Sequence, residues 1–297
     1  MRVFVTGASG WIGSAVVPEL IGAGHQVIGL ARSDASAEAL AAAGAEVQRG
    51  DLEDLDSLRA GAAASDGVIH LAFIHDFSQF ANSLSVDQRA IETIGAALEG
   101  SDRPLVIASG TLGLALGRAA IEDDRPAVGS GAHPRVVSAE MTLALASRGV
   151  RSCVLRLPPT VHGDGDHGFM AALISVARER GVSGFIGDGS NRWSAVHRFD
   201  AARLFRLAAE AAPAGSVLHA IDDEGVPLHE IAAVIGRQLD VPVASVPEAE
   251  AVDHFGWLGR FLGADATASS ALTRERMGWQ PTHPGLIEDL EAGHYFS

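Results

Sequence analysis

The chain opens with Arg2-Val3-Phe4-Val5-Thr6-Gly7-Ala8-Ser9-Gly10-Trp11-Ile12-Gly13, a short apolar run that leads into a glycine-rich turn. The run predicts a buried strand, and the Ala- and Val-rich residues that follow predict a helix. Glycines at such a junction let the backbone approach a pyrophosphate, which the free N–H groups and the positive end of the helix dipole attract. The spacing alone also suits an ordinary turn, but its place after a strand favours dinucleotide binding. The expected contacts come from Thr6, Gly7, Ser9, Gly10, Trp11, Ile12 and Gly13.

The first half of the chain alternates β-rich runs with Ala- and Leu-rich stretches at helical spacing, a pattern typical of βαβ units. Expected strands are residues 2–6, 26–30, 46–49, 67–71, 105–109 and 152–156, and expected helices are residues 14–23, 35–43, 55–64, 86–98 and 138–148. Crossovers of this length are almost always right-handed. The pattern therefore predicts an α/β protein with a doubly wound parallel sheet, the Rossmann fold.

After residue 156 the pattern loosens into Gly- and Pro-rich loops. The segments still predicted are helices at residues 170–180, 201–211, 228–239 and 271–278, and a strand at residues 217–221. Ligands of doubly wound sheets bind at the carboxyl ends of the strands. We therefore expect residues 1–157 to form an NADP-binding Rossmann domain, and residues 158–297 to form a small substrate-binding lobe with elements that return to the sheet.

Composition restricts the class of protein. The 297 residues are 47% hydrophobic and 20% charged, which is typical of a globular fold. A formal net charge of −15 disfavours nucleic acid and anionic membranes as partners. The single Cys153 can form no internal disulfide, and no apolar window is long enough to span a membrane. We expect a cytoplasmic protein that acts on a small molecule.

The end of the second expected strand bears on the choice of cofactor. An NAD-binding protein often places a carboxylate there for the adenosine ribose, whereas this chain has Arg32. A guanidinium can bind a 2′-phosphate through two hydrogen bonds, so NADP(H) is favoured over NAD(H). Two alternatives stay open: Arg32 is merely solvated, or Asp34 serves the ribose. Asp51, which precedes Leu52, is placed to meet the adenine or else to cap the next turn.

Six motifs along the chain resemble, in order, those of the extended short-chain dehydrogenase/reductases. They are TGASGWIG at 6–13, GDL at 50–52, HLAF at 70–73, VIASGT at 106–111, LRLPPTVHGDG at 155–165 and VHRFDAARL at 196–204. The resemblance implies an NAD(P)-binding domain with a C-terminal lobe in a dehydrogenase, reductase, epimerase or dehydratase. It also implies that His70 to Phe73, with Leu71, Ala72 and Phe73 as contacts, line the cofactor, that Pro158 to Val161 contact its nicotinamide end, and that the chain forms a homodimer through the fourth and fifth helices. Asp51 and Leu52, after the third expected strand, are further expected cofactor contacts.

The catalytic Tyr-x-x-x-Lys pair of that family has no counterpart here. The chain contains no lysine, and its one tyrosine, Tyr295, is the third residue from the end. If Ser138 is aligned with the family motif, Arg135 takes the tyrosine position; if Glu140 is aligned, Ala132 takes it. Asp87 also stands near a position where the family commonly has asparagine. The chain therefore resembles an atypical member in which basic residues replace the pair.

Other residues are candidates for the missing chemistry. Ser109 and Thr111 at the fifth strand could donate hydrogen bonds to a carbonyl oxygen, or simply cap the strand. His133 and Arg135 lie near the missing tyrosine and could stabilise negative charge, unless they belong to a solvated loop. His75, next to Asp76, is a further candidate acid.

The stretch His162-Gly163-Asp164-Gly165-Asp166-His167 superficially resembles a metal site, but the family's glycine-rich turn explains its glycines. We expect no metal, and we expect His162 and His167 to line the substrate pocket. Trp193 is expected to wall that pocket or to pack in the core. Asp200 is expected to cap the helix that begins at residue 201.

These expectations favour an NADP-dependent oxidoreductase that reduces a small carbonyl compound with a non-standard active site. Two alternatives remain open. The first is a non-catalytic NADP-binding sensor, which the missing Tyr-x-x-x-Lys pair favours. The second is an epimerase or dehydratase, for which the chain lacks the tyrosine base.

Overall fold

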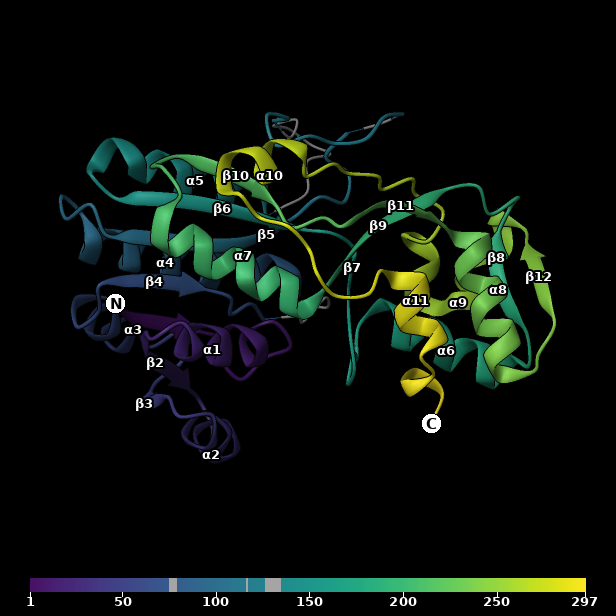
Figure 1. The fold of residues 1–297 in the computed structure, drawn as a ribbon, viewed down its shortest axis with the longest axis horizontal. Coiled ribbons are helices and arrows are strands. Elements are labelled where there is room, and N and C mark those ends of the chain that lie inside the picture. The colour runs from purple at the N-terminus through teal and green to yellow at the C-terminus, as the bar shows by residue number, and fades with distance from the viewer. Residues whose placement is uncertain (75–78, 116, 126–134) are drawn as a thin grey trace.

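A seven-stranded parallel sheet organises the N-terminal part of the computed structural model, which describes residues 1–74, 79–115, 117–125 and 135–297 (Figure 1). Its order is β10-β6-β5-β4-β1-β2-β3, with every neighbouring pair parallel. The strands are β1 (Arg2–Thr6), β2 (Gln26–Ala31), β3 (Glu46–Arg49), β4 (Gly67–His70), β5 (Pro104–Gly110), β6 (Arg151–Leu157) and β10 (Ser216–His219). The predicted doubly wound α/β fold is confirmed. The strand order reverses between β1 and β4, the place where such sheets bind ligands.

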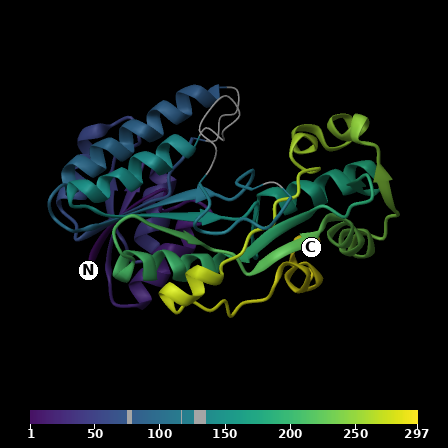
Figure 2. The same cartoon turned by 90° about the horizontal axis from the view of Figure 1, so that it is seen from above.

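Helices cover both faces of this sheet, as Figure 2 shows from above. They are α1 (Gly13–Gly22) and α7 (Arg198–Ala211) on one face, α3 (Leu55–Ala63), α4 (Phe80–Leu98) and α5 (Val136–Ala144) on the other, and α2 (Asp34–Ala42) beyond β2 and β3. Alternation along β1 explains the two cores, because Val3 and Val5 pack on the α1 face and Phe4 packs on the α3 face. Strands buried on both faces are expected to be continuously apolar, as β1 is.

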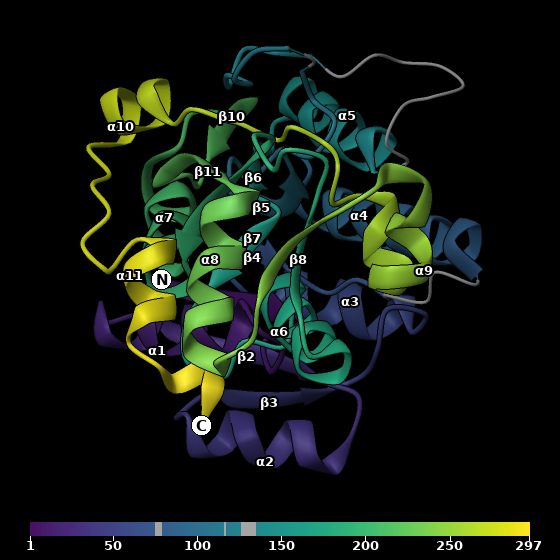
Figure 3. The same cartoon turned by 90° about the vertical axis from the view of Figure 1, so that its right-hand side faces the viewer.

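The C-terminal lobe has its own small sheets and its own core. Its strands are β7 (Thr160–His162), β9 (Arg192–His197) and β11 (Asp223–Pro227) in one sheet, and β8 (Ser183–Ile186) and β12 (Val243–Val246) in another. Its helices are α6 (Phe169–Arg180), α8 (Leu228–Leu239), α9 (Ala251–Phe255) and α11 (Leu286–Glu291). Figure 3 shows α8 and α11 packed side by side on the face of this lobe.

The last part of the chain connects the two halves. Helix α10 (Ala271–Met277) packs against α7 and β10 of the Rossmann sheet, and the following segment crosses to α11 of the lobe (Figure 1). The described ranges also contain the 3₁₀ turns η2 (Leu145–Arg148), η3 (Glu248–Glu250), η4 (Gly256–Arg260) and η5 (His294–Phe296). None of the helices in those ranges is long and apolar enough to cross a membrane.

Candidate functional site

The glycine loop between β1 and α1 is so tight that only glycine fits at two positions. Gly7 has φ +64°, and a Cβ there would lie 2.6 Å from the backbone nitrogen of Ala72 at the end of β4. A Cβ on Gly13 would collide with the carbonyl oxygen of Gly7, and Gly10 N–H donates to that same oxygen at 2.9 Å. The loop therefore forms a shallow cradle at the carboxyl edge of the sheet, where a pyrophosphate can approach the backbone.

The cradle offers unsatisfied donors. Within the described residues, the backbone N–H groups of Ser9, Trp11 and Ile12 donate to no protein acceptor, and Ile12 caps α1 without a side-chain hydrogen bond. The first N–H groups of a helix are the usual ligands of an anion at this place. These residues therefore fit the diphosphate of a dinucleotide.

The segment after β4 closes one side of the loop. Leu71 N–H donates to the backbone oxygen of Thr6, and Ala72 N–H donates to the Thr6 hydroxyl at 3.3 Å. Leu71, Ala72 and Phe73 are all half-buried. On the other side, the Trp11 indole donates to the carbonyl oxygen of Val161 in β7 at 2.9 Å. Leu71, Ala72 and Val161 thus border the cradle, and Pro158 lies just after β6. Contacts of these residues with a cofactor stay a prediction.

Arg32 and Asp34, the two residues expected near the adenosine ribose, have different surroundings. Arg32, directly after β2, is exposed, whereas Asp34 forms an ion pair with Arg49 of β3. Asp51 accepts hydrogen bonds from the N–H groups of Glu53 and Asp54 at 2.8 and 3.0 Å, so its Oδ1 caps the turn. The following Leu52 is buried in the core. Contact between Asp51 and an adenine stays a prediction.

A buried chain of hydrogen bonds runs from the glycine loop to α5. Thr6 Oγ1 and His70 Nδ1 are 2.8 Å apart, His70 Nε2 and Asp87 Oδ1 are 3.2 Å apart, and Ser138 Oγ donates to Asp87 Oδ2 at 2.6 Å. A carboxylate only accepts, so His70 Nε2 carries the proton that it donates to Asp87. Burial raises the pKa of Asp87, but the His70 hydrogen bond, with the His70 and Arg135 charges, leaves it below its usual value.

Asp87 stands out in the sequence as a departure from the family pattern, but the sequence pattern does not predict its partners His70 and Ser138. The sequence contains one signal for the contact between Thr6 and His70. Neighbouring parallel strands bring their last residues together, and β1 and β4 pair Thr6 with His70. The contact from His70 to α4 and α5 depends on helix packing, which the sequence pattern does not specify.

Arg135 directly precedes α5 and turns inward. Its guanidinium donates to the backbone oxygen of Ala108 in β5 at 2.7 Å and lies 4.5 Å from the centre of the Phe73 ring. Burial lowers the pKa of Arg135, while the negative charge of Asp87 raises it. A fixed cation therefore stands at the start of α5, and whether Arg135 takes the tyrosine position, as the alignment on Ser138 has it, stays a prediction.

The two hydroxyl candidates at β5 differ. Thr111 is buried, and both its N–H and its hydroxyl donate to the backbone oxygen of Leu157, at 3.0 and 3.4 Å. It therefore caps the strand end, the second of its two expected roles. Ser109 is half-buried, and in the part of the chain that the structure describes its hydroxyl has no partner. Ser109 directly follows Ala108, whose backbone oxygen accepts the hydrogen bond from Arg135. His75, Asp76 and His133 lie outside the described residues.

Two residues expected at the substrate pocket lie inside the lobe instead. His162 is fully buried, and its Nδ1 contacts Asp289 of α11 at 2.8 Å. Burial and the charge of His162 lower the pKa of the neighbouring His197 to about 4. Trp193 is also fully buried, and its indole donates to Ala264 O at 3.1 Å. The expectation that His162 lines a pocket is corrected, because Asp289 near the end of the chain covers it. Trp193 packs in the core of the lobe, the second of its two expected roles.

His167 is the exception, since it is exposed and its ring meets the edge of the Trp11 indole at 5.5 Å. It therefore borders the glycine loop, while its contact with a substrate stays a prediction. No three metal-ligating side chains within the described ranges are arranged to hold an ion.

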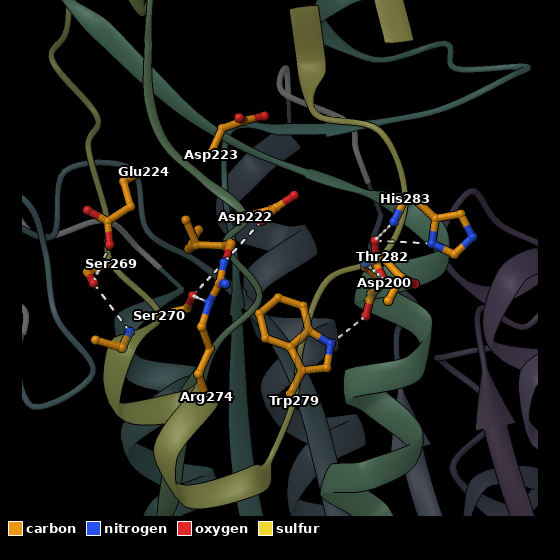
Figure 4. Close-up of polar contacts among 12 residues, drawn as sticks. Asp200, Asp222, Asp223, Glu224, Ser269, Ser270, Arg274, Trp279, Thr282 and His283 are labelled. Carbon is orange, nitrogen blue, oxygen red and sulfur yellow. Dashed lines mark hydrogen bonds and ion pairs between the residues drawn. The ribbon is translucent and has the colours of Figure 1, made fainter. Parts of the chain in front are cut away.

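Asp200 does not cap a helix that begins at residue 201, because α7 already begins at Arg198. Its carboxylate accepts from the N–H groups of Thr282 and His283 at 3.0 and 2.9 Å, and the Trp279 indole donates to its backbone oxygen at 3.0 Å (Figure 4). The expected role is corrected: Asp200 anchors the segment that crosses from α10 to α11.

The one tyrosine of the chain returns toward the site but is unsuited to proton transfer. Tyr295 donates to Asp166 at 3.0 Å and accepts from Gly163 N–H at 3.2 Å. Burial and the charge of Asp166 raise the pKa of Tyr295 well above its usual value. An acid this weak gives up its proton poorly at neutral pH.

Comparisons with known proteins identify the family of the chain. A model of the NAD dependent epimerase/dehydratase family matches residues 3–95. An uncharacterized protein of Schizosaccharomyces pombe is 51% identical over 300 residues, 100% of each chain. A 4-hydroxy-2-methyl-3-oxo-4-farnesyl-3,4-dihydroquinoline-1-oxide ketoreductase of Stigmatella aurantiaca is 28% identical over 86% of this chain and 80% of its own. UDP-glucose 4-epimerase of Thermus thermophilus, solved with NAD, superimposes with a TM-score of 0.75 at 21% identity over 99% of each chain.

The last of these likenesses concerns the fold alone. The relative from S. pombe matches from end to end, and the family model spans the glycine loop and the strands on either side of it. We conclude that the chain belongs to the NAD dependent epimerase/dehydratase family.

Proposed function

We propose that this protein is an NADP-dependent oxidoreductase that reduces a small carbonyl compound. The observation that supports it most is the pairing of Ser109 with Arg135. Arg135 donates to the backbone oxygen of Ala108, the residue before Ser109, so a free hydroxyl and a fixed cation stand together at the end of β5. Groups of this kind stabilise the negative charge that develops on a carbonyl oxygen during reduction.

The residues of the glycine loop would hold the dinucleotide, which supplies the hydride when bound. The Ser109 hydroxyl donates a hydrogen bond to the substrate oxygen, and the Arg135 guanidinium stabilises the alkoxide that forms there. Water supplies the proton that completes the alcohol. Asp87 balances the buried charge of Arg135 and so keeps the guanidinium in place.

Preference for NADP rests on the end of β2. Arg32 is exposed with no carboxylate within 4.0 Å among the described residues, and β2 and β3 pair Ala31 with Arg49. Arg32 and Arg49 thus stand at the ends of neighbouring strands, where we expect a 2′-phosphate to lie, and Arg49 neutralises Asp34. A 2′-phosphate gains from this positive surface, whereas a ribose hydroxyl gains little.

The distant relative from Stigmatella aurantiaca supports the reaction class, because its name assigns it ketone reduction. We also propose a cytoplasmic location and a homodimer through α4 and α5. Val137 of α5 supports such a contact, since this apolar side chain is 50% exposed. Sedimentation of the wild type and of Val137→Glu would test the dimer, which the charge should dissociate.

The test of function measures oxidation of NADPH by a panel of aldehydes, ketones and quinones. We expect turnover with at least one carbonyl class, and we expect Ser109→Ala and Arg135→Met each to lower kcat by about a hundredfold. Arg59→Met, on the exposed surface of α3, is the control and should leave turnover unchanged. Tight NADPH binding without oxidation across the panel would refute the reductase and favour a cofactor sensor. Interconversion of sugar nucleotides without net NADPH oxidation would favour an epimerase.

A further inference from the structure

Arg198, the first residue of α7, is packed against two aromatic rings. Its guanidinium carbon lies 4.4 Å from the centre of the Trp11 ring and 4.8 Å from that of Phe199. Its Nε is fully buried and has no hydrogen-bond partner. Gly163 lies close against the stem of the side chain, since a Cβ there would come within 3.3 Å of Arg198 Cγ. The side chain is therefore held in place, yet its charge is not matched.

This combination is unusual in the chain. Nearly all partly buried arginines donate to a carboxylate or to a backbone oxygen; for example, Arg206 pairs with Glu19 and Glu210. Within the described residues, Arg198 is the half-buried arginine with neither a hydrogen bond nor a carboxylate within 4.0 Å. The other arginines without either are exposed: Arg32, Arg89, Arg125 and Arg260. A partly buried cation without an anion in a protein of net charge −15 indicates that the anion is a ligand.

The position of Arg198 indicates which ligand. Trp11 belongs to the glycine loop, its indole is fixed on Val161 O, and its own backbone N–H is one of the free donors of the cradle. Helices α1 and α7 pack against each other, and both run antiparallel to the strands, so both begin at the carboxyl edge of the sheet. Arg198 thus stands at the edge where the diphosphate of a dinucleotide would lie, and Arg32 stands at the adenosine end.

We propose that Arg198 binds the pyrophosphate of the dinucleotide, together with the backbone N–H groups of Trp11 and Ile12. The ring of Trp11 orients the guanidinium before the ligand arrives, which limits the entropy lost on binding. The proposal rests on dinucleotide binding, which is part of the proposed function, but not on catalysis.

Titration calorimetry with three ligands tests the role of Arg198. NADP⁺ carries both a pyrophosphate and a 2′-phosphate. ADP-ribose has the pyrophosphate but no 2′-phosphate, and adenosine 2′-monophosphate has the 2′-phosphate but no pyrophosphate. We expect Arg198→Gln to weaken NADP⁺ and ADP-ribose about tenfold and to leave adenosine 2′-monophosphate unchanged. Arg198→Lys keeps the charge and should recover most of the affinity. Arg276→Gln removes the same charge beside β10, at the far edge of the sheet, and should change no affinity.

The melting temperature without ligand separates this role from a structural one. Since the Arg198 charge has no partner among the described residues, Arg198→Gln should melt at the wild-type temperature or above it. Equal affinities for wild type and variant would overturn the proposal. So would a lower melting temperature with parallel loss of all three ligands, or a loss confined to the KM of a carbonyl substrate. The expected binding pattern without any carbonyl reduction would support the role of Arg198 and refute the reductase.

Discussion

Replacement of Asp87 by asparagine tests whether the buried chain of hydrogen bonds stabilises the fold through charge. Asparagine has nearly the same shape, so the change removes the negative charge without creating a cavity. The amide offers one acceptor oxygen where the carboxylate offers two, and it turns an NH₂ group toward either Ser138 Oγ or His70 Nε2. Both present hydrogen bonds, at 2.6 and 3.2 Å, therefore lose their charged acceptor.

The expected loss follows from these contacts. A hydrogen bond to a charged group contributes about 1.5–3 kcal/mol, and removing one partner of a buried charge pair costs about 3–5 kcal/mol. Arg135 would lose its nearby counter-charge but keep its bond to Ala108 O. We expect Asp87→Asn to lower the free energy of unfolding by about 3 kcal/mol at neutral pH.

The contribution of Asp87 to stability should depend on pH in a definite direction. The pKa of Asp87 in the folded protein lies below the ordinary value of 3.8. Its ionised form therefore contributes stability that is complete above about pH 5 and is lost as the pH falls through the folded-state pKa. The difference between wild type and Asp87→Asn should shrink over that acid range.

Urea unfolding followed by circular dichroism at several pH values measures both quantities. Asp56→Asn is a matched control, because Asp56 is an exposed aspartate of α3 that pairs with Arg59. This control should unfold like the wild type. A wild-type unfolding free energy for Asp87→Asn at neutral pH, or a difference that grows as the pH falls, would refute the reasoning.

Three further predictions concern separate parts of the chain. Gly13→Ala should lower the free energy of unfolding by about 3 kcal/mol and abolish dinucleotide binding, because the new methyl group would collide with the backbone of the glycine loop. Gly22→Ala, at the other end of the same helix with open space around it, is the control and should be neutral or stabilising in the same thermal unfolding measurements. Arg32→Glu should reverse the preference between NADP⁺ and NAD⁺ in calorimetry, and an unchanged ratio would contradict the role of the β2 end. Burial raises the pKa of Cys153 to about 12, so a thiol reagent should react with it only after unfolding, and fast labelling of the native protein would contradict its burial.

The Rossmann part of the fold could be predicted closely because its signals are local. Strands β1 (Arg2–Thr6) and β3 (Glu46–Arg49) have the expected bounds. The apolar run before Gly7 identifies β1 as a buried strand, whereas β3 is a half-exposed edge strand of mostly polar residues that lies between Gly44 and Gly50. Helix α4 begins at Phe80, six residues before the expected start at Val86. The polar residues in between have weak helix propensity, and the tertiary fold extends the helix over them.

The lobe was less predictable because its strands depend on distant partners. Strand β8 (Ser183–Ile186) pairs with β12 (Val243–Val246) across some sixty residues, and both have only four residues. His162 illustrates the same limit at the site. Its burial depends on Asp289, 127 residues later in the sequence, so a pattern of neighbouring histidines and aspartates misleads about exposure.

The two departures from the family pattern, at Asp87 and Arg135, are connected in the structure. Read along the sequence, Asp87 stands near an expected asparagine and Arg135 takes the place of a tyrosine, and nothing connects them. In the fold, the two charges interact. The charge of Arg135 lowers the pKa of Asp87, and the charge of Asp87 raises the pKa of Arg135, so each favours the ionised form of the other. A buried guanidinium at the tyrosine position requires an anion nearby, and a buried carboxylate on α4 requires a cation. The substitutions therefore form a compensated pair. On the alignment that gives Arg135 the tyrosine position, the pair would put a fixed positive charge where the family has a neutral proton donor. That charge suits the proposed reduction, because a reduction needs stabilisation of an oxyanion as well as a proton.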